Sequence, residues 1–472
     1  MENTPLLGST TDQQQQQQGQ EALVEQQRRR TRRIQWFTSR AVFLCVFLFV
    51  VGVATRLAQR IDNVELRVDV AAVVANLKTL EEIGRHSRSV AGTGFAQSVA
   101  FVKETLENNT DFAVWTEALV VEEQVDDEKP SLVVGNTAFT PRIDFLTATY
   151  SGSGVVKNAT LVPLAGCRSS DAPQLENWVA LVSSQPSRQE TTPDCDNSLC
   201  ARVAFAIEAG AKAVLVSVNP TAQGYPNPLA PSGRLPRTCN TPSNRAIYSK
   251  APILSLSQSL SWSLHLQSID SPSVSLSATT SYKPITVHNV LAEPRAGFSK
   301  PESIVIFGCH LDSVRAGPGV NDDGSGAMAT LELALAYSRD RTITIQRKPN
   351  PPLHYKANID TDMIASPNYV RGIWDGRSVT DPAIRNASIA IQRVFEDYFH
   401  DQELPTVPFK FNGRSDFAPF MARGIPAGGV ITGEDEIKTH EQAELFGGVA
   451  GMVLDPNYHQ PTDTVENCVD LV

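Results

Sequence analysis

Residues 303–340 combine an apolar run, a Gly-rich polar loop and a helix-forming segment, and this order constrains the fold more than any other feature. The run SIVIFG (303–308) is short, apolar and rich in β-branched residues, which predicts a buried strand of a parallel sheet. The segment SGAMATLELALAYSRD (325–340) has apolar residues at helical spacing, with Ser325 available near the helix start. The chain therefore predicts an α/β fold whose intervening loop lies beyond the carboxyl end of a strand, where such sheets bind ligands.

The loop itself, CHLDSVRAGPGVNDDGSG (309–326), carries residue types that bind metal ions. A neutral imidazole from His310 and a carboxylate from Asp322 suit an open catalytic zinc site. Asp312 is close enough in sequence to His310 to orient its imidazole. The alternative interpretation is that Asp322, Asp323 and Gly324 form a turn and helix cap and that His310 is an ordinary loop histidine.

Two later segments offer further ligands at strand ends. In ANIDTDMIASPNY (357–369) an apolar strand leads to Asp362, and in DPNYHQPTDT (455–464) His459 lies on a Pro-rich loop where Asp463 could support it. Of the eight histidines, only His310 and His459 have such settings. Two histidines and a carboxylate that can bridge are typical of two zinc ions that activate water and polarise a scissile carbonyl.

These segments resemble the signature segments of the di-zinc aminopeptidases related to vacuolar aminopeptidase Y. The resemblance rests on HLDSVRAGPGVNDDGSG, NIDTDMIASPNY, GRSDFAPF (413–420) and NYHQPTDT, and on HSRSVAGTGFAQSVAFVKETLEN near residues 70–120. Residues 140–275 are similar to the protease-associated domain inserted in many members. The resemblance implies an α/β zinc-exopeptidase fold with a mixed sheet flanked by helices, formed by residues 66–130 and 281–472. It also implies an inserted β-rich protease-associated domain over residues 131–280.

The resemblance also implies roles for individual residues. It assigns His310 and Asp362 to one Zn²⁺, His459 to the other, and Asp322 to both. Arg414 and Tyr458 match groups that hold the tetrahedral oxyanion, and the substrates would be peptides. From the residues alone, Arg414 could equally cap a turn and Tyr458 could be a half-buried tyrosine. The residue removed from the peptide is undetermined, although Phe417 and Phe420 suggest an apolar pocket.

One departure from the family pattern concerns the catalytic carboxylates. Family members carry a strand that ends in a Glu–Glu pair, which supplies the general base and a ligand of the second zinc. Here the chain reads RDRTITIQRKPNPPLHYKANID, and no glutamate occurs from Leu333 to Phe395. A Pro-rich basic run cannot continue a central strand. Either the chain is a pseudoenzyme, or the written sequence has lost a segment.

Without the Glu–Glu pair, His310, Asp362 and Asp322 remain for one zinc, whereas the other retains only His459 and its share of Asp322. We therefore expect about one tightly bound zinc per chain and little or no catalysis. The alternative function is a membrane-anchored, peptidase-like receptor that binds partners without hydrolysis, as the architecture of the transferrin-receptor relatives suggests.

The first 56 residues differ in composition from the rest. Residues 1–35 contain QQQQQQ and few apolar positions, which predicts a disordered tail. The run AVFLCVFLFVVGVA (41–54) is flanked by arginines, and we interpret residues 36–56 as an uncleaved signal anchor, with the core of a cleaved signal peptide as the alternative. The arginines before it predict a cytosolic tail and a single-pass type II protein. The string ENTPLLG resembles a vacuolar sorting signal, which favours the vacuolar or lysosomal lumen or the secretory pathway.

Cysteines and sequons agree with a lumenal body. Cys167, Cys195, Cys200 and Cys239 could form two disulfides whose pairing cannot be deduced from the sequence. Asparagines 108, 158 and 386 begin glycosylation sequons. Residues 131–280 contain one clear helix, in CARVAFAIEAGAKAVLVSV (200–218), and no ligand set, whereas TVHNVLAEP (286–294) is expected to return to the catalytic sheet. The net charge of −10 argues against nucleic-acid binding, and the oligomeric state is undetermined.

Overall fold

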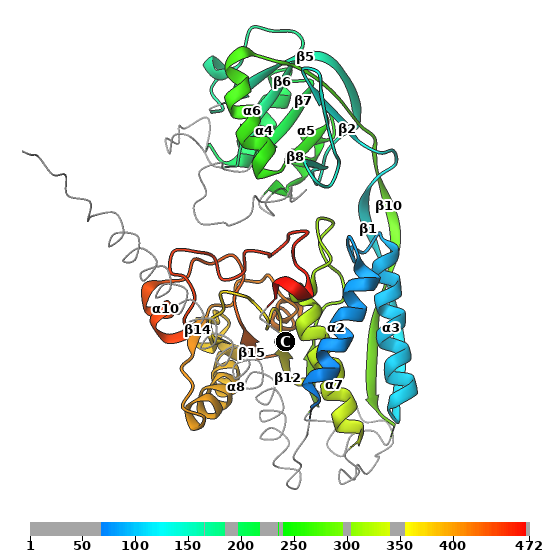
Figure 1. Ribbon diagram of the computed structural model, residues 1–472, viewed down its shortest axis with the longest axis vertical. Coiled ribbons are helices and arrows are strands. Elements are labelled where there is room, and N and C mark those ends of the chain that lie inside the picture. The colour runs from blue at the N-terminus through cyan, green and yellow to red at the C-terminus, as the bar shows by residue number, and fades with distance from the viewer. Residues whose placement is uncertain are drawn as a thin grey trace, which may run out of the picture.

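The computed structural model describes residues 68–164, 166–184, 197–217, 235, 239–295, 304–339 and 355–468. The predicted tail, the run 36–56, Cys195 and the stretch 340–354 lie outside these ranges. Within them, no helix is both long and apolar enough to span a membrane. The described chain forms two units joined by a long two-stranded ribbon (Figure 1).

The lower unit in Figure 1 is built on a five-stranded mixed sheet with the strand order β11-β12-β15-β13-β14. Strands β11, β12 and β15 are parallel, whereas β13 runs antiparallel to β15 and parallel to β14. The predicted α/β fold with a mixed sheet flanked by helices is confirmed. Its elements are α2 (Val70–Gly84), α3 (Thr93–Asn109), β11 (Ile304–Gly308), α7 (Gly326–Arg339), β12 (Tyr355–Asp360), β13 (Gly372–Trp374), α8 (Pro382–Asp401), β14 (Val407–Phe409), α9 (Phe417–Met421), β15 (Ala427–Ile431) and α10 (His440–Phe446).

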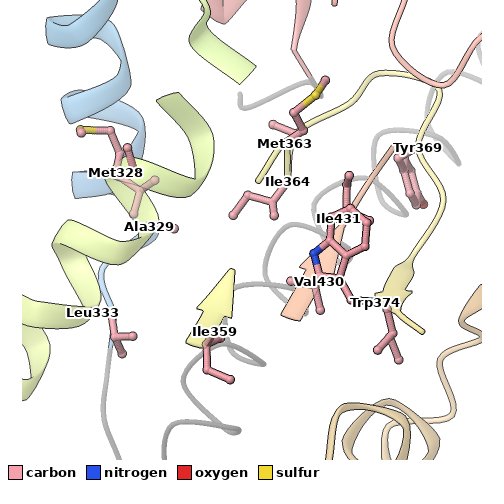
Figure 2. Packing of buried hydrophobic residues seen from close by; sticks show 14 of the residues in the cluster. Met328, Ala329, Leu333, Ile359, Met363, Ile364, Tyr369, Trp374, Val430 and Ile431 are labelled. Carbon is pink, nitrogen blue, oxygen red and sulfur yellow. The ribbon is translucent and has the colours of Figure 1, made fainter. Parts of the chain in front are cut away.

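Apolar side chains from the helices and the sheet form one continuous core (Figure 2). Met328 and Leu333 come from α7, Ile359 from β12, and Val430 and Ile431 from β15, and all belong to one cluster of buried residues. The apolar positions that predicted the helix after residue 325 are therefore the ones that pack against this unit's core. This packing fixes the strand ends from which the polar loops emerge.

Strand β11 forms one edge of the five-stranded sheet as far as the chain is described. It pairs in parallel with β12, as the sequence predicts. However, Val305, Ile306 and Phe307 are only half-buried, although the all-apolar sequence predicted a strand buried on both faces. An apolar strand with an unpaired edge can pair with another chain and aggregate, so proteins normally cover such an edge.

The expected return of residues 286–294 to the catalytic sheet is wrong for the described residues. They belong to β10 (Thr280–Pro294), which pairs along its length with β1 (Phe112–Asp126) in a separate two-stranded antiparallel sheet. Sequence pattern predicts a strand but not its partner, because pairing depends on segments far apart in the chain. This ribbon connects the two units (Figure 1).

The upper unit contains an eight-stranded sheet with the order β3-β2-β9-β5-β6-β7-β8-β4. It is β-rich, as expected for the insert, but its described residues form three α-helices, whereas the sequence predicted one clear helix. The helices α5 and α6 are short, which weakens their periodic signal. The elements are β2 (Ser131–Val134), β3 (Thr137–Phe139), β4 (Phe145–Thr147), β5 (Gly154–Leu164), β6 (Trp178–Ser183), α4 (Leu199–Glu208), β7 (Ala213–Ser217), α5 (Pro242–Tyr248), β8 (Ile253–Leu256), α6 (Gln258–Gln267) and β9 (Ser273–Ala278).

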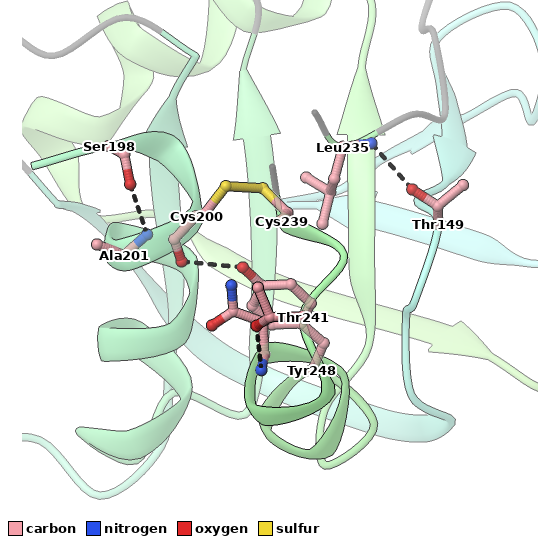
Figure 3. The surroundings of a disulfide bond; sticks show 9 residues. Thr149, Ser198, Cys200, Ala201, Leu235, Cys239, Thr241 and Tyr248 are labelled. Atoms are coloured by element: carbon pink, nitrogen blue, oxygen red, sulfur yellow. Dashed lines mark hydrogen bonds between the residues drawn. A yellow bond between two sulfur atoms is a disulfide. The ribbon is translucent and has the colours of Figure 1, made fainter. Parts of the chain in front are cut away.

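A disulfide joins Cys200 of α4 to Cys239 in this upper unit (Figure 3). Next to it, the Tyr248 hydroxyl donates a hydrogen bond of 3.0 Å to the carbonyl oxygen of Cys200. Cys167 is also disulfide-bonded. Disulfides of this kind persist in oxidising compartments.

The upper unit contacts the loop that carries His310. Arg315 of this loop forms a 2.8 Å ion pair with Glu123 of β1 and also donates to the carbonyl oxygen of Gln124. Leu146 of β4 is buried with Val314 and Ala316 in a small apolar cluster. The insert is therefore attached to the His310 loop as well as to the ribbon.

Candidate metal centre

His310 follows β11 by two residues and lies at the carboxyl end of that strand. Its Nδ1 is 3.0 Å from the carbonyl oxygen of Asp312 and 3.4 Å from the Asp312 carboxylate. These contacts direct Nε2 away from Asp312 and toward Asp322. Burial opposes protonation of His310, but the contacts with Asp312 and Asp322 outweigh it and raise its pKa well above the ordinary range.

Asp322 lies between the two histidines that the sequence singled out. Its Oδ1 is 3.2 Å from His310 Nε2, and its Oδ2 is 3.1 Å from His459 Nε2. Burial opposes ionisation, yet the hydrogen bonds from His310 and His459 hold the pKa of Asp322 well below its usual range. One carboxylate thus faces two imidazoles, each of which points a nitrogen toward it.

Asp362 completes a group of three possible ligands with His310 and Asp322. One potential ligand atom from each of the three lies within 4.8 Å of the others, and Asp362 Oδ2 is 3.9 Å from His310 Nε2. The Asp362 Oδ1 atom is buried without a hydrogen-bond partner among the described residues, and burial raises the Asp362 pKa to about 7. A buried carboxylate oxygen without a partner, beside imidazole nitrogens, fits a divalent cation.

The loop with Asp322 is fixed by the segment that carries His459. The Asp463 carboxylate accepts hydrogen bonds from the backbone N–H groups of Asn321 (2.7 Å) and Asp322 (3.2 Å). The Asn321 side chain donates to Asp455 at 2.6 Å. We expected Asp463 to support His459, whereas its carboxylate supports the backbone of Asp322. The peptide bond between Asp322 and Asp323 is cis.

Arg414 and Tyr458 lie together near this centre. The Arg414 guanidinium carbon is 5.3 Å from the Tyr458 ring centroid, and the Tyr458 ring stacks on that of His459 with centroids 3.8 Å apart. Burial raises the pKa of the Tyr458 hydroxyl well above its usual range, so this group retains its proton. Both side chains can therefore donate hydrogen bonds toward developing negative charge.

Glu434, which follows β15, was not among the residues predicted for the site. It is 2% exposed, and its Oε2 is 2.9 Å from Arg414 Nη1. Burial is the main cause that raises its pKa to about 8, although Arg414 opposes this shift. Only the proximity of Arg414 distinguishes Glu434, because GEDE (433–436) looks like an exposed acidic turn in the sequence.

The apolar pocket expected beside Phe417 is not supported for that residue. Phe417 is 1% exposed and packs within the core, with its ring centroid 4.7 Å from that of Trp374 and 4.8 Å from that of Phe411. Its ring is therefore part of a buried aromatic cluster with those of Trp374 and Phe411.

The fold and the site together define a class of protein. Histidines and aspartates converge beyond the carboxyl ends of adjacent parallel strands, with an arginine and a protonated tyrosine beside them. Such a set is typical of metal-dependent hydrolases of the α/β class. The particular family follows from comparison with known proteins.

The model of peptidase family M28 matches residues 289–349 and 340–471. The match consists of two segments that overlap between residues 340 and 349, which is the stretch where the Glu–Glu pair is absent. Together with the curated relatives below, this match shows that the chain belongs to peptidase family M28.

Curated relatives and solved structures agree with this assignment. The chain is 41% identical to a probable leucine aminopeptidase 2 of Aspergillus fumigatus over 207 residues, which cover 39% of this chain and 40% of the relative. It is 32% identical to a probable leucine aminopeptidase 2 of Aspergillus oryzae over 349 residues, covering 69% and 66%. The chain thus spans about 40% of the length of the first relative and about two thirds of the second.

A zinc aminopeptidase from Bacillus subtilis has the same fold as this chain. The two structures superpose with a TM-score of 0.59 at 17% identity, covering 86% of this chain and 91% of that one. An aminopeptidase from an Aneurinibacillus species gives a TM-score of 0.52 at 19% identity, covering 85% and 90%. These similarities establish the zinc-aminopeptidase fold for this chain.

Proposed function

We propose that this chain is a zinc-dependent aminopeptidase, which removes N-terminal residues from peptides, in a form whose catalytic centre is incomplete. The observation that carries the proposal is the Asp322 carboxylate, which lies between His310 Nε2 and His459 Nε2 at 3.2 and 3.1 Å. Family membership and the leucine aminopeptidase relatives support the reaction type.

Each site residue has a role in this proposal. His310 and Asp362 would hold one Zn²⁺, His459 the other, and Asp322 would contact both. Zinc at such a site lowers the pKa of bound water and polarises the scissile carbonyl. Asp312 orients His310 through Nδ1. Arg414 and Tyr458 donate hydrogen bonds to the oxygen that gains negative charge as the peptide bond is attacked.

The impairment follows from the missing Glu–Glu pair. No glutamate between Leu333 and Phe395 is available as general base or as a further zinc ligand. The half-buried apolar residues of β11 at the edge of the described sheet support the view that a neighbouring strand is lacking. The division of the family match at residues 340–349 supports it as well.

The origin of the incomplete site is tested by the transcript across Thr344 to Tyr355. Retention of His310, Asp322, Asp362, Arg414 and His459 favours the loss of a segment over a pseudoenzyme, because a chain released from catalysis has no chemical need of them. If the transcript encodes a strand that ends in Glu–Glu, the protein that it encodes has the complete catalytic site. If the transcript matches the chain and the purified protein still hydrolyses aminoacyl amides, our assignment of the general base to the missing Glu–Glu pair is wrong.

The experiment that tests the activity compares two forms of the protein. A chain containing the Glu–Glu segment should release apolar N-terminal residues from chromogenic amides only in the presence of zinc. The 472-residue form should give no measurable turnover. If the longer form is inactive with zinc bound, the aminopeptidase proposal is wrong.

The second candidate is a partner-binding receptor without hydrolysis. The structural feature that favours it is the inserted unit, whose eight-stranded sheet has a core of its own. The feature that favours the enzyme is the converging ligand set, because a receptor needs no zinc. Zinc binding by the wild-type chain therefore discriminates between the two candidates.

We also propose that the body is lumenal and anchored by residues 36–56, which lie outside the described residues. The disulfide between Cys200 and Cys239 supports an oxidising compartment. The three sequon asparagines are exposed, which leaves them accessible to glycosylation. Carbonate extraction that releases the full-length protein, or a mature N-terminus near Thr55, contradicts the anchor.

A further inference from the structure

Arg88, in the turn between α2 and α3, is a fully buried arginine. Its side chain is 0% exposed, and no described carboxylate lies within ion-pair distance of it. Burial lowers the pKa of the Arg88 guanidinium, whereas the carboxylates of Asp463, Asp322 and Asp312 act in the opposite direction. Burying an isolated charge costs free energy of folding, so the burial of Arg88 indicates that this side chain has a specific role.

The Arg88 side chain donates hydrogen bonds to backbone carbonyls of the loop that follows His310. Its Nε contacts the Leu311 carbonyl oxygen at 3.0 Å, and its Nη1 contacts that of Gly319 at 2.7 Å and also that of Pro318. Leu311 adjoins His310, and Gly319 precedes Asp322 by three residues. One guanidinium therefore connects the two ends of the loop between the two ligands.

The backbone around Arg88 strengthens this connection. The N–H of Arg88 donates to Ser313 Oγ at 2.8 Å, and the N–H of Ser313 donates to the Arg88 carbonyl at 3.2 Å. The Ser87 hydroxyl donates to the Val314 carbonyl at 2.8 Å. Close packing also needs Gly84, where an added Cβ would lie 2.9 Å from Arg88 Cγ. The turn that contains Arg88 therefore packs closely against the loop that follows His310.

We propose that Arg88 is a positioning residue of the metal centre, which holds both ends of loop 311–319 so that His310 and Asp322 face each other. The inference rests on the proposed zinc site. It predicts that the loss of Arg88 weakens metal binding although Arg88 contacts no metal.

The test compares zinc affinity in four full-length proteins, measured by competition with a chelator well below the unfolding temperature. Arg88→Met should bind zinc about 10–100-fold more weakly than wild type, the usual cost of losing a group that orients metal ligands. Arg88→Lys retains the positive charge but lacks the planar guanidinium group. Its zinc affinity should therefore lie between those of the wild type and Arg88→Met. The Co²⁺-loaded Arg88→Met protein should also show a shifted ligand-field absorption spectrum, which reports ligand geometry.

Arg202→Met is the matched control. Arg202 is also buried, at 1% exposure, and donates to a backbone carbonyl, that of Asn197, but it lies in the inserted unit. Its loss should lower thermal stability and leave zinc affinity unchanged. Wild-type zinc affinity in Arg88→Met overturns the inference alone, whereas a wild-type chain that binds no zinc overturns the proposed function and the inference with it.

If Arg88→Met does not fold, Ser313→Ala replaces it in the test. This variant removes the acceptor of the Arg88 N–H without leaving a charge unpaired. It should weaken zinc binding several-fold, and a folded Ser313→Ala protein with unchanged affinity contradicts the positioning role.

Discussion

At the scale of single residues, the proposed chemistry depends most on the arrangement around Asp322. Its two oxygens each face one histidine, so a neutral replacement removes charge from both possible metal positions. We expect Asp322→Asn to weaken zinc binding by more than about 100-fold, because even loss of a group that supports a ligand costs about 10–100-fold. Isothermal titration with zinc measures the change.

The control for this variant is Asp435→Asn. Asp435 pairs with Arg414 at 2.8 Å but is 54% exposed and belongs to a different acidic group. It should bind zinc like the wild type. If Asp322→Asn and Asp435→Asn lose zinc affinity equally, the loss reflects the change in net charge near the site and not the removal of a zinc ligand.

A second residue-scale prediction concerns Lys438, which is 1% exposed and donates to the carbonyl of Tyr369 at 2.7 Å. Burial lowers the pKa of Lys438 from 10.5 to about 8. Between these values the unfolded chain holds more protons than the folded one, so the stability contribution of this group rises with pH. Below about pH 8 both states are protonated, and the contribution stays constant.

Lys438→Met should therefore lack this rise, which is checked by urea unfolding at about pH 7.5 and pH 9.5. Lys103→Met is a control, because Lys103 lies on the surface of α3 and pairs there with Glu107. An identical pH dependence of wild type and Lys438→Met shows that Lys438 is not buried as described.

The sequence could predict some of these residues and not others. His310, Asp322, Asp362 and His459 stand in short motifs beside strand ends, so their residue types and spacing indicated a common site. Their roles as ligands are still predictions. Glu434 and Arg88 gave no such signal, because their importance arises from contacts with residues distant in the sequence. A buried arginine cannot be distinguished from an exposed one by its neighbours in the chain.

At the scale of elements, β11 leads to a prediction about amide exchange. Among the described strands it has a partner on one side only, β12, whereas β12 lies between β11 and β15. The amides of β12 should therefore be strongly protected, and part of those in β11 should exchange fast. Hydrogen exchange followed by mass spectrometry of the 472-residue form measures both. Equal, strong protection of β11 and β12 contradicts an open edge.

Elements with strong local patterns were predictable, and those defined by distant partners were not. The segments that became β11 and α7 were expected within one or two residues of their observed ends. By contrast, the pairing of β10 with β1 joins residues up to 182 positions apart, from Phe112 to Pro294. The short helices α5 and α6 were missed because seven to ten residues carry little periodic information.

At the scale of the whole molecule, Arg315 attaches the loop that carries His310 to the ribbon that joins the two units. The ion pair with Glu123 and the contact with the Gln124 carbonyl hold the loop against the ribbon. We expect Arg315→Met to increase the range of orientations between the units, seen as a larger radius of gyration in small-angle X-ray scattering. Lys212→Met, on the exposed surface of the inserted unit, should leave it unchanged. An unchanged radius in Arg315→Met contradicts the bracing role.

We propose that this chain retains the ligands of one metal position and only part of those of the second. In this proposal His310, Asp362 and a share of Asp322 would provide three ligands, whereas His459 and the other share of Asp322 would provide two. The most direct measurement is the zinc content of the purified 472-residue protein after dialysis. Our account predicts about one zinc per chain, because three protein ligands hold zinc firmly and two do not. Two zinc ions per chain, both retained on dialysis, would contradict it.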